Sequence, residues 1–183
     1  MKNRSMQTKK VGGREELQKH FVEELKDLYN AESQLIKALP KMAKAAKSEE
    51  LRSAFEEHLD VTKEQINRLK QIFDELAEKP TGVHCKGMEG LVAEGEEKIK
   101  EGKKEEGSMK DIALIAAAQK VEHYEISGYG TARTLAENLG MQEAAELLQQ
   151  TLDEEGEADK KLTEISEGLL QREEVQFQQA DEA

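Results

Sequence analysis

The residues of this chain that are best suited to chemistry are acidic and imidazole side chains set inside apolar helical patterns. Apolar residues recur at three- and four-residue steps along four segments, which is the periodicity of an amphipathic helix. Each apolar stripe is interrupted by an acid or a histidine where a hydrophobic residue is expected. If the stripes face inward, the interrupting side chains lie in the core. They are Glu32, His58, Glu122, Glu125, Glu155 and Asp159.

Carboxylates gathered in a protein core need a compensating charge. An ionised carboxylate is costly to bury without a partner, and neighbouring carboxylates repel one another. A divalent cation removes both penalties, because carboxylate oxygens and an imidazole nitrogen are suitable ligands for iron, manganese or zinc. Acids and histidines that project from the facing helices of a bundle are typical of dinuclear metal centres. The pattern therefore predicts a site for divalent metal ions.

Each candidate also has an alternative role that needs no metal. An acid at the edge of a stripe can pair with a basic residue, such as Lys160 or Arg133, or can face solvent at the rim of its helix. A lone histidine such as His58 can be a hydrogen-bonded core residue. His84 and Cys85 are neighbours in a connecting segment and are too few to hold a metal ion, so we assign them no role.

The positions of the candidates along the chain favour one half of the site. Glu122 lies 16 residues before position 138, and Glu155 lies 15 residues after position 140. Two antiparallel helices joined by a turn between these positions bring both acids to the same level. In the first helical pair, Glu32 lies 15 residues before position 47, whereas His58 lies only 9 residues after position 49. That mismatch of six residues is about 9 Å along a helix axis, too far for a shared metal ion.

The elements that must position these residues are four long helices. Ser48 is the expected N-cap of the second helix, and Pro40 is expected to kink or end the first. Thr62 and Gln65 are the residues of the second helix nearest the level of Glu32. The helices are predicted over 14–47, 48–79, 111–138 and 141–170.

The remaining segments are predicted to connect or flank these helices. The glycine-containing segment 83–107 is expected to cross the bundle, with one short helix over 91–99. Residues 1–13 are expected to form a disordered basic tail, and residues 169–183 a frayed acidic tail. The predicted fold is all-α, a four-helix bundle over 14–168 with one long crossover that carries the short helix.

The composition agrees with a helical protein and excludes other classes. Aromatic residues make up only 4% of the 183 residues and there are two prolines, unlike a β-sandwich or barrel. The 39 acidic and 27 basic residues give a net charge of −12, which disfavours nucleic-acid binding. The single cysteine, Cys85, excludes an internal disulfide, and the sequence has no apolar run long enough to span a membrane. We therefore expect a cytoplasmic protein with no membrane or nucleic-acid partner.

Several segments of the chain resemble one known family. They follow in order between residues 14 and 168 and include AFEEHLDVTKEQINRL, CKGMEGLVAEGEE, KVEHYEISGYGT and LLQQTLDEEGEADKKLTEI. On these segments, of which KVEHYEISGYGT is the most distinctive, the chain resembles the YciE/YciF-type bacterial ferritin-like stress proteins. The resemblance implies a ferritin-like four-helix bundle, a homodimer and a dinuclear metal centre. It makes iron the first candidate for the metal, with manganese and zinc as alternatives.

The resemblance also implies a ligand set. The acidic positions of the family and its histidine fall on the six candidates already named. The chain departs from the wider ferritin-like pattern in the second helix, where Thr62 and Gln65 occupy the region of an acid and a histidine three residues apart. It departs again in the fourth helix, where Asp159 follows Glu155 in place of a histidine. The implied set therefore has His58 as its one nitrogen ligand.

Three functions fit these observations. The first is a dinuclear metal protein of the stress response that acts on peroxide, oxygen or ferrous iron. The second is a stress-induced binding or structural dimer whose metal is absent or only structural. The third is a helical module that binds a protein partner through its acidic faces and holds no metal.

Overall fold

The computed structural model describes residues 2–81, 83–101 and 108–181. Within these residues the chain forms five helices and no strand. The side chains of residues 2–12, 176, 177 and 179–181 are not described. The helices are α1 (Lys2–Ala45), α2 (Glu49–Glu75), α3 (Lys86–Glu101), α4 (Met109–Leu139) and α5 (Gln142–Asp181).

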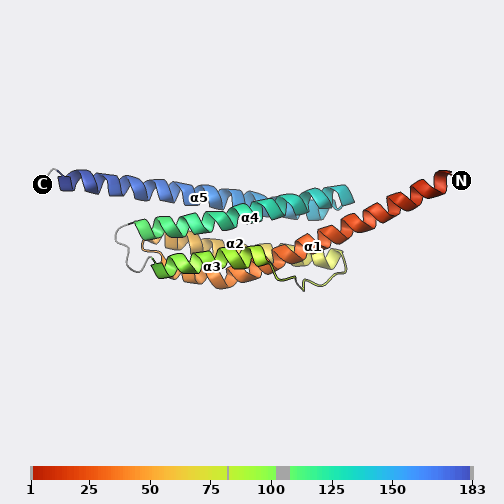
Figure 1. The fold of residues 1–183 in the computed structure, drawn as a ribbon, viewed down its shortest axis with the longest axis horizontal. Helices are drawn as coiled ribbons and strands as arrows, with labels where there is room; N and C mark the ends of the chain where they lie inside the picture. The colour runs from red at the N-terminus through yellow and green to blue at the C-terminus, as the bar shows by residue number, and fades with distance from the viewer. Residues whose placement is uncertain (1, 82, 102–107, 182–183) are drawn as a thin grey trace.

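Two helical hairpins form the bundle (Figure 1). α1 packs against α2, α4 packs against α5, and the long connection between the hairpins carries α3, which packs on α1 and α4. The predicted four-helix bundle with one long crossover is confirmed. The crossover helix is longer than the predicted 91–99, and residues 102–107 of the crossover lie outside the described residues. Among the described helices, none is both long enough and apolar enough to cross a membrane.

Local signals in the sequence set the ends of the helices. Ser48 is the N-cap of α2, as predicted, because its hydroxyl oxygen accepts a hydrogen bond from the Leu51 N–H at 3.2 Å. Gly140 ends α4 with φ 75°, a left-handed conformation that glycine adopts without strain. Pro40 does not end α1, which continues to Ala45.

The predicted tails are helical where the structure describes them. α1 begins at Lys2 rather than Arg14, and α5 continues to Asp181. Gly12 and Gly13 each disfavour a helix by only about 1 kcal/mol, so they do not interrupt it. In Figure 1 the first turns of α1 and the last turns of α5 project past opposite ends of the bundle. Leu169, which we assigned to the frayed tail, is 4% exposed and belongs to the core.

The apolar core is divided into two clusters with a polar layer between them. One cluster contains Leu39, Phe55 and Ile115, and the other contains Phe21, Phe73 and Tyr129. On each long helix, the residues between the two clusters include buried polar side chains. These are Glu32 on α1, Thr62 and Gln65 on α2, Glu122 and Glu125 on α4, and Thr151 and Glu155 on α5.

Candidate metal centre

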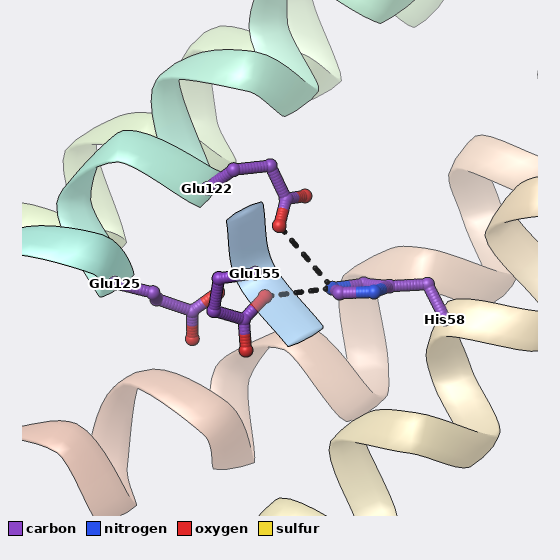
Figure 2. A group of neighbouring side chains, drawn as sticks. All are labelled: His58, Glu122, Glu125 and Glu155. Carbon is purple, nitrogen blue, oxygen red and sulfur yellow. Dashed lines mark ion pairs between the residues drawn. The ribbon is translucent and has the colours of Figure 1, made fainter. Parts of the chain in front are cut away.

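Four of the six predicted side chains converge in this polar layer. His58, Glu122, Glu125 and Glu155 each offer one ligand atom, and these atoms all lie within 4.8 Å of one another. Figure 2 shows Glu122 and Glu155 directed at the imidazole of His58. The Nε2 atom of His58 lies 3.5 Å from Oε2 of Glu122 and 3.7 Å from Oε2 of Glu155. We call these four residues the carboxylate cluster.

The carboxylate cluster is buried and short of hydrogen-bond donors. Glu125 and Glu155 are 0% exposed, and Glu122 is 3% exposed. Both carboxyl oxygens of Glu125 lack a hydrogen-bond partner, as do Oε2 of Glu122, Oε2 of Glu155 and Nε2 of His58. Buried polar atoms in folded proteins are almost always hydrogen bonded, so several unpaired atoms around one point call for a missing partner. Oxygen and imidazole nitrogen atoms with free lone pairs fit a divalent cation.

Burial also raises the pKa values of the acids in and beside this cluster. Desolvation, together with the charges of Glu32 and Asp159, raises the pKa of Glu122 to about 8. The pKa values of Glu125 and Glu155 are raised well above the usual value, first by desolvation and then by neighbouring carboxylates. Without a cation, burial therefore favours the protonated form of these groups. A cation would replace those protons as the source of positive charge.

Glu32 lies beside the carboxylate cluster but is not one of its four members. Its Oε1 atom accepts a hydrogen bond from the Tyr129 hydroxyl, and its Oε2 atom has no partner. Its pKa is raised well above the usual value by desolvation and by the charge of Glu155. Tyr129 is fully buried, and its hydroxyl fixes the orientation of Glu32.

Gln65 takes a supporting position that the sequence did not assign. Its side-chain amide donates a hydrogen bond to Oε1 of Glu155 and a longer one, 3.3 Å, to Oε2 of Glu154. Arg68 holds Glu154 with two contacts of 2.8 Å and 2.5 Å. The hydroxyl oxygen of Thr62 is buried and has no partner. Helix α2 therefore supplies one imidazole and one amide to the polar layer.

Asp159 is not among the residues that converge. Its Oδ1 atom accepts a hydrogen bond of 3.0 Å from Gln119 and lies 3.6 Å from Nε2 of His123. The Asp159 side chain is 23% exposed, and that of His123 is 68% exposed. Asp159 follows Glu155 by four residues, a rotation of about 40° around the helix, and this rotation turns it toward α4 and the surface.

His58 joins the cluster through Glu122 rather than through Glu32. The sequence predicts an offset of about 9 Å along the helix axis between His58 and Glu32. The structure places the imidazole of His58 against Glu122. Glu122 lies one turn before Glu125 on α4 and meets His58, while Glu125 lies near Glu32. The alignment from the sequence assumed that all ligands share one level.

Cys85, to which we assigned no role, anchors the crossover. Its thiol is 0% exposed and donates to Oδ2 of Asp27 at 3.0 Å. The Tyr124 hydroxyl also donates to Oδ2 of Asp27, at 2.6 Å, and lies 3.0 Å from the sulfur. The Met88 N–H points to the sulfur at 3.4 Å, so Cys85 caps the start of α3. Its position just before a helix was the signal that could have predicted this role.

A bundle of long helices whose interior carries converging carboxylates and an imidazole defines the ferritin-like class of helical proteins. Comparison with known proteins identifies the family to which the chain belongs. The family described as "Domain of unknown function (DUF892)" matches residues 16–174. Protein YciF of Escherichia coli (strain K12) is 48% identical over 147 residues, which are 80% of this chain and 87% of that protein.

Two solved structures are also similar to this chain. The crystal structure of the E. coli stress protein YciF superposes with a TM-score of 0.81 at 46% identity and covers 85% of this chain and 97% of its own. YcfI from Rhodopseudomonas palustris gives a TM-score of 0.76 at 40% identity, covering 80% of this chain and 92% of its own. The chain therefore belongs to the DUF892 family, and the resemblance to YciF-type proteins found in its sequence is confirmed.

Proposed function

We propose that this chain binds divalent metal ions at the carboxylate cluster, with iron as the first candidate, and that it uses a dinuclear centre there to act on peroxide, oxygen or ferrous iron. One observation carries the proposal. Three buried carboxyl groups with unpaired oxygens converge on one imidazole, which cannot neutralise all of them. A divalent cation supplies both the charge and the bonds that these atoms lack.

The residues around the cluster have distinct tasks in this proposal. The four cluster residues would hold the first ion, and Glu32, a buried carboxylate whose charge acts on Glu122 and Glu125, would contribute to a second. Tyr129 orients Glu32, and Gln65 orients Glu155. Hydrogen bonds of this kind to ligands tune metal affinity in other proteins. Divalent ions bound by these residues would supply Lewis-acid activation of an oxygen-containing substrate.

Metal binding is tested by comparing two acid-to-amide variants. The EDTA-treated protein is titrated with Fe²⁺, Mn²⁺ and Zn²⁺ by calorimetry under anaerobic conditions, and protein from metal-supplemented medium is analysed by mass spectrometry. We expect Glu125→Gln to weaken binding by at least about tenfold. Asp159→Asn is the matched control, because Asp159 lies outside the cluster, and it should bind like the unmodified chain. A chain that binds none of the ions contradicts the proposal.

The reaction is tested separately from binding. Protein loaded with Fe²⁺ without oxygen is mixed with hydrogen peroxide or oxygen, and the oxidant remaining is measured with an electrode. Faster consumption than by Fe²⁺ alone, lost in Glu125→Gln, supports the redox function. A protein that binds ions tightly but consumes neither oxidant has a structural metal. A structural role has been suggested for the relative YcfI.

A further inference from the structure

An open groove between α2 and α5 leads to the carboxylate cluster. Its volume is about 660 Å³, and its lining includes His58 and Glu122. The Glu122 side chain is only 4% exposed, and its Oε2 atom has no hydrogen-bond partner. α3 packs on α1 and α4, so this helix, the described part of the crossover that packs on the bundle, leaves the α2–α5 side uncovered. The groove therefore leads from solvent to the side of the cluster that His58 and Glu122 form.

The charged residues that line the groove are mostly acidic, and they lie among apolar side chains. The lining includes six acidic residues and one lysine, Lys161. Glu57, Asp153 and Glu157 are exposed at the rim, and half-buried Val61 and Ala158 lie between the charged residues. A cleft lined by charges of one sign concentrates ions of the opposite sign and speeds their arrival. This lining attracts cations.

Two ion pairs connect α2 with α5 beside the groove and hold the two helices at a fixed spacing. Lys161 pairs with Glu57, and Arg68 pairs with Glu154 at 2.5 Å. Both basic side chains are thus occupied by acidic partners. Asp153 and Glu157 make their own contacts only with neighbours on α5, among the interactions the structure describes. Asp153 accepts a hydrogen bond from Gln149 and Glu157 is ion-paired with Lys160 at 2.6 Å, so neither carboxylate is tied to α2 and both stay exposed at the rim.

We propose that the α2–α5 groove is the route by which divalent cations reach the carboxylate cluster, and that its acidic rim accelerates their arrival. This inference rests on the proposed metal-binding function. The rim residues attract the hydrated ion, and Glu122 and His58 are the first cluster residues that it meets. The groove thereby gives α2 and α5 a role in metal loading as well as in holding ligands.

A second cavity that touches the cluster is poorly suited to ions. It lies under α3, has a volume of about 40 Å³, and also reaches His58 and Glu122. Its other walls include Leu35, Leu91 and Val92. A hydrated cation would have to shed its water against these apolar side chains, which is unfavourable. The wide acidic groove is the better route on both size and charge.

The rate of metal loading tests the role of the rim. Co²⁺ is mixed with the EDTA-treated full-length protein in a stopped-flow spectrometer, and binding is followed through its visible absorption. In the double variant Asp153→Asn/Glu157→Gln, we expect the association rate constant to fall by at least about threefold at low salt, with the same number of ions bound at saturation. The difference should disappear in about 0.5 M salt, where the charges are screened.

A control variant separates the rim from the overall charge. Glu97→Lys changes the net charge by +2, as the double variant does, but lies exposed on α3, away from α2 and α5. Its association rate should match that of the unmodified chain. Equal rates in the double variant and in this control overturn the proposed route.

Blocking the groove gives a second, independent test. Ala158→Phe places a ring in the groove, and we expect association and dissociation of Co²⁺ to slow by a similar factor while the affinity stays the same. Circular dichroism checks that the variant folds. If it does not fold, the rim variant still decides the outcome. Unchanged rates in folded Ala158→Phe contradict the route, whereas a failure of the unmodified chain to bind Co²⁺ contradicts the proposed function instead.

Discussion

At the scale of single residues, the buried acids of the polar layer lower the stability of the metal-free fold and supply the ligands for the proposed metal ions. Glu122, Glu125 and Glu155 lie where hydrophobic side chains would pack without penalty. Their oxygens lack hydrogen-bond partners, and burial raises their pKa values, so the metal-free protein favours the protonated form of these groups. A residue kept at such a cost to stability is typical of a functional site.

The raised pKa of Glu122 predicts how the stability of the metal-free protein depends on pH. The pKa of Glu122 is about 8 in the folded state and about 4.5 in the unfolded state. The contribution of its protonated carboxyl to the free energy of unfolding is therefore fully present below pH 4.5. That contribution is lost as the pH rises toward 8. At 1.36 kcal/mol per unit, the shift sets an upper bound of about 5 kcal/mol.

Urea unfolding of the EDTA-treated protein between pH 5 and pH 8 measures this loss. We expect Glu122→Gln to remove much of the slope, because the amide does not ionise, and to be more stable than the unmodified chain at pH 8. The same variant should bind metal ions more weakly. Parallel stability profiles for the two proteins would show that Glu122 does not titrate in this range.

At the scale of elements, the start of α3 is fixed against α1 and α4. The Cys85 N–H donates to the side chain of Asn30 at 2.8 Å, and the Cys85 carbonyl accepts from Gln34 at 3.0 Å. A Cβ atom added at Gly87 would lie 2.6 Å from a ring carbon of Tyr124. The hydroxyl of that ring is hydrogen bonded to Asp27, so the ring has little freedom to move. Glycine is therefore required for this contact.

Two alanine substitutions in α3 test this close approach. Gly87→Ala should destabilise the protein by about 1–3 kcal/mol, because the new methyl group overlaps the Tyr124 ring. Gly90→Ala is the matched control, since no atom lies within 4 Å of its added Cβ, and it should stabilise the helix by up to about 1 kcal/mol. Thermal unfolding of both variants measures the difference. Similar melting temperatures would mean that α3 is not held against Tyr124.

The register between the two hairpins is set in part by Asp111 at the start of α4. Its carboxylate, 1% exposed, accepts hydrogen bonds from the Lys47 N–H at 2.8 Å and the Ser48 N–H at 2.7 Å. We expect Asp111→Ala to cost about 2–3 kcal/mol, because two backbone donors lose their partner. Asp111→Asn should cost less, since its amide keeps one acceptor. Chemical denaturation measures both, and unchanged stability in Asp111→Ala would exclude this clamp.

At the scale of the whole molecule, the polar layer joins two apolar clusters to which the same four helices contribute. Metal ions bound by the carboxylate cluster and Glu32 would contact side chains from all four long helices. Metal binding should therefore stabilise the fold as one unit. At an ion concentration of 100 times Kd, linkage gives about 2.7 kcal/mol.

Differential scanning calorimetry of the metal-free and metal-loaded protein measures this stabilisation. The melting temperature should rise with ion concentration in the unmodified chain and in Asp159→Asn, and should rise much less in Glu125→Gln. An equal rise in all three proteins would indicate that the ions bind outside the carboxylate cluster.

The homodimer implied by the family resemblance remains a prediction at this scale. Light scattering should give a mass of twice the 20.6 kDa chain. Association would bury apolar side chains that one copy leaves exposed, such as Leu170 and Val175, which are 47% and 52% exposed. A mass of one chain at micromolar concentration would contradict the dimer.

Much of the fold follows from the sequence alone. Helical periodicity, the Ser48 cap and the turn at Gly140 are local features, so they predicted the four long helices and the hairpins that join them. The interrupted stripes also identified the buried acids Glu122, Glu125 and Glu155, because burial of a helix face depends on the same periodicity. These features need no knowledge of how distant segments meet.

The tertiary structure decided which of the candidates meet. The level of His58 relative to Glu122 depends on the register of one hairpin against the other, which the Asp111 clamp helps to set across 64 residues of chain. The separation of Glu155 from Asp159 depends on a rotation of about 40° at one helix interface. Neither quantity is local, because each results from side chains packing across helices. Helical periodicity therefore predicts that these residues lie near the core. The packing of the helices determines which four of them converge in the carboxylate cluster.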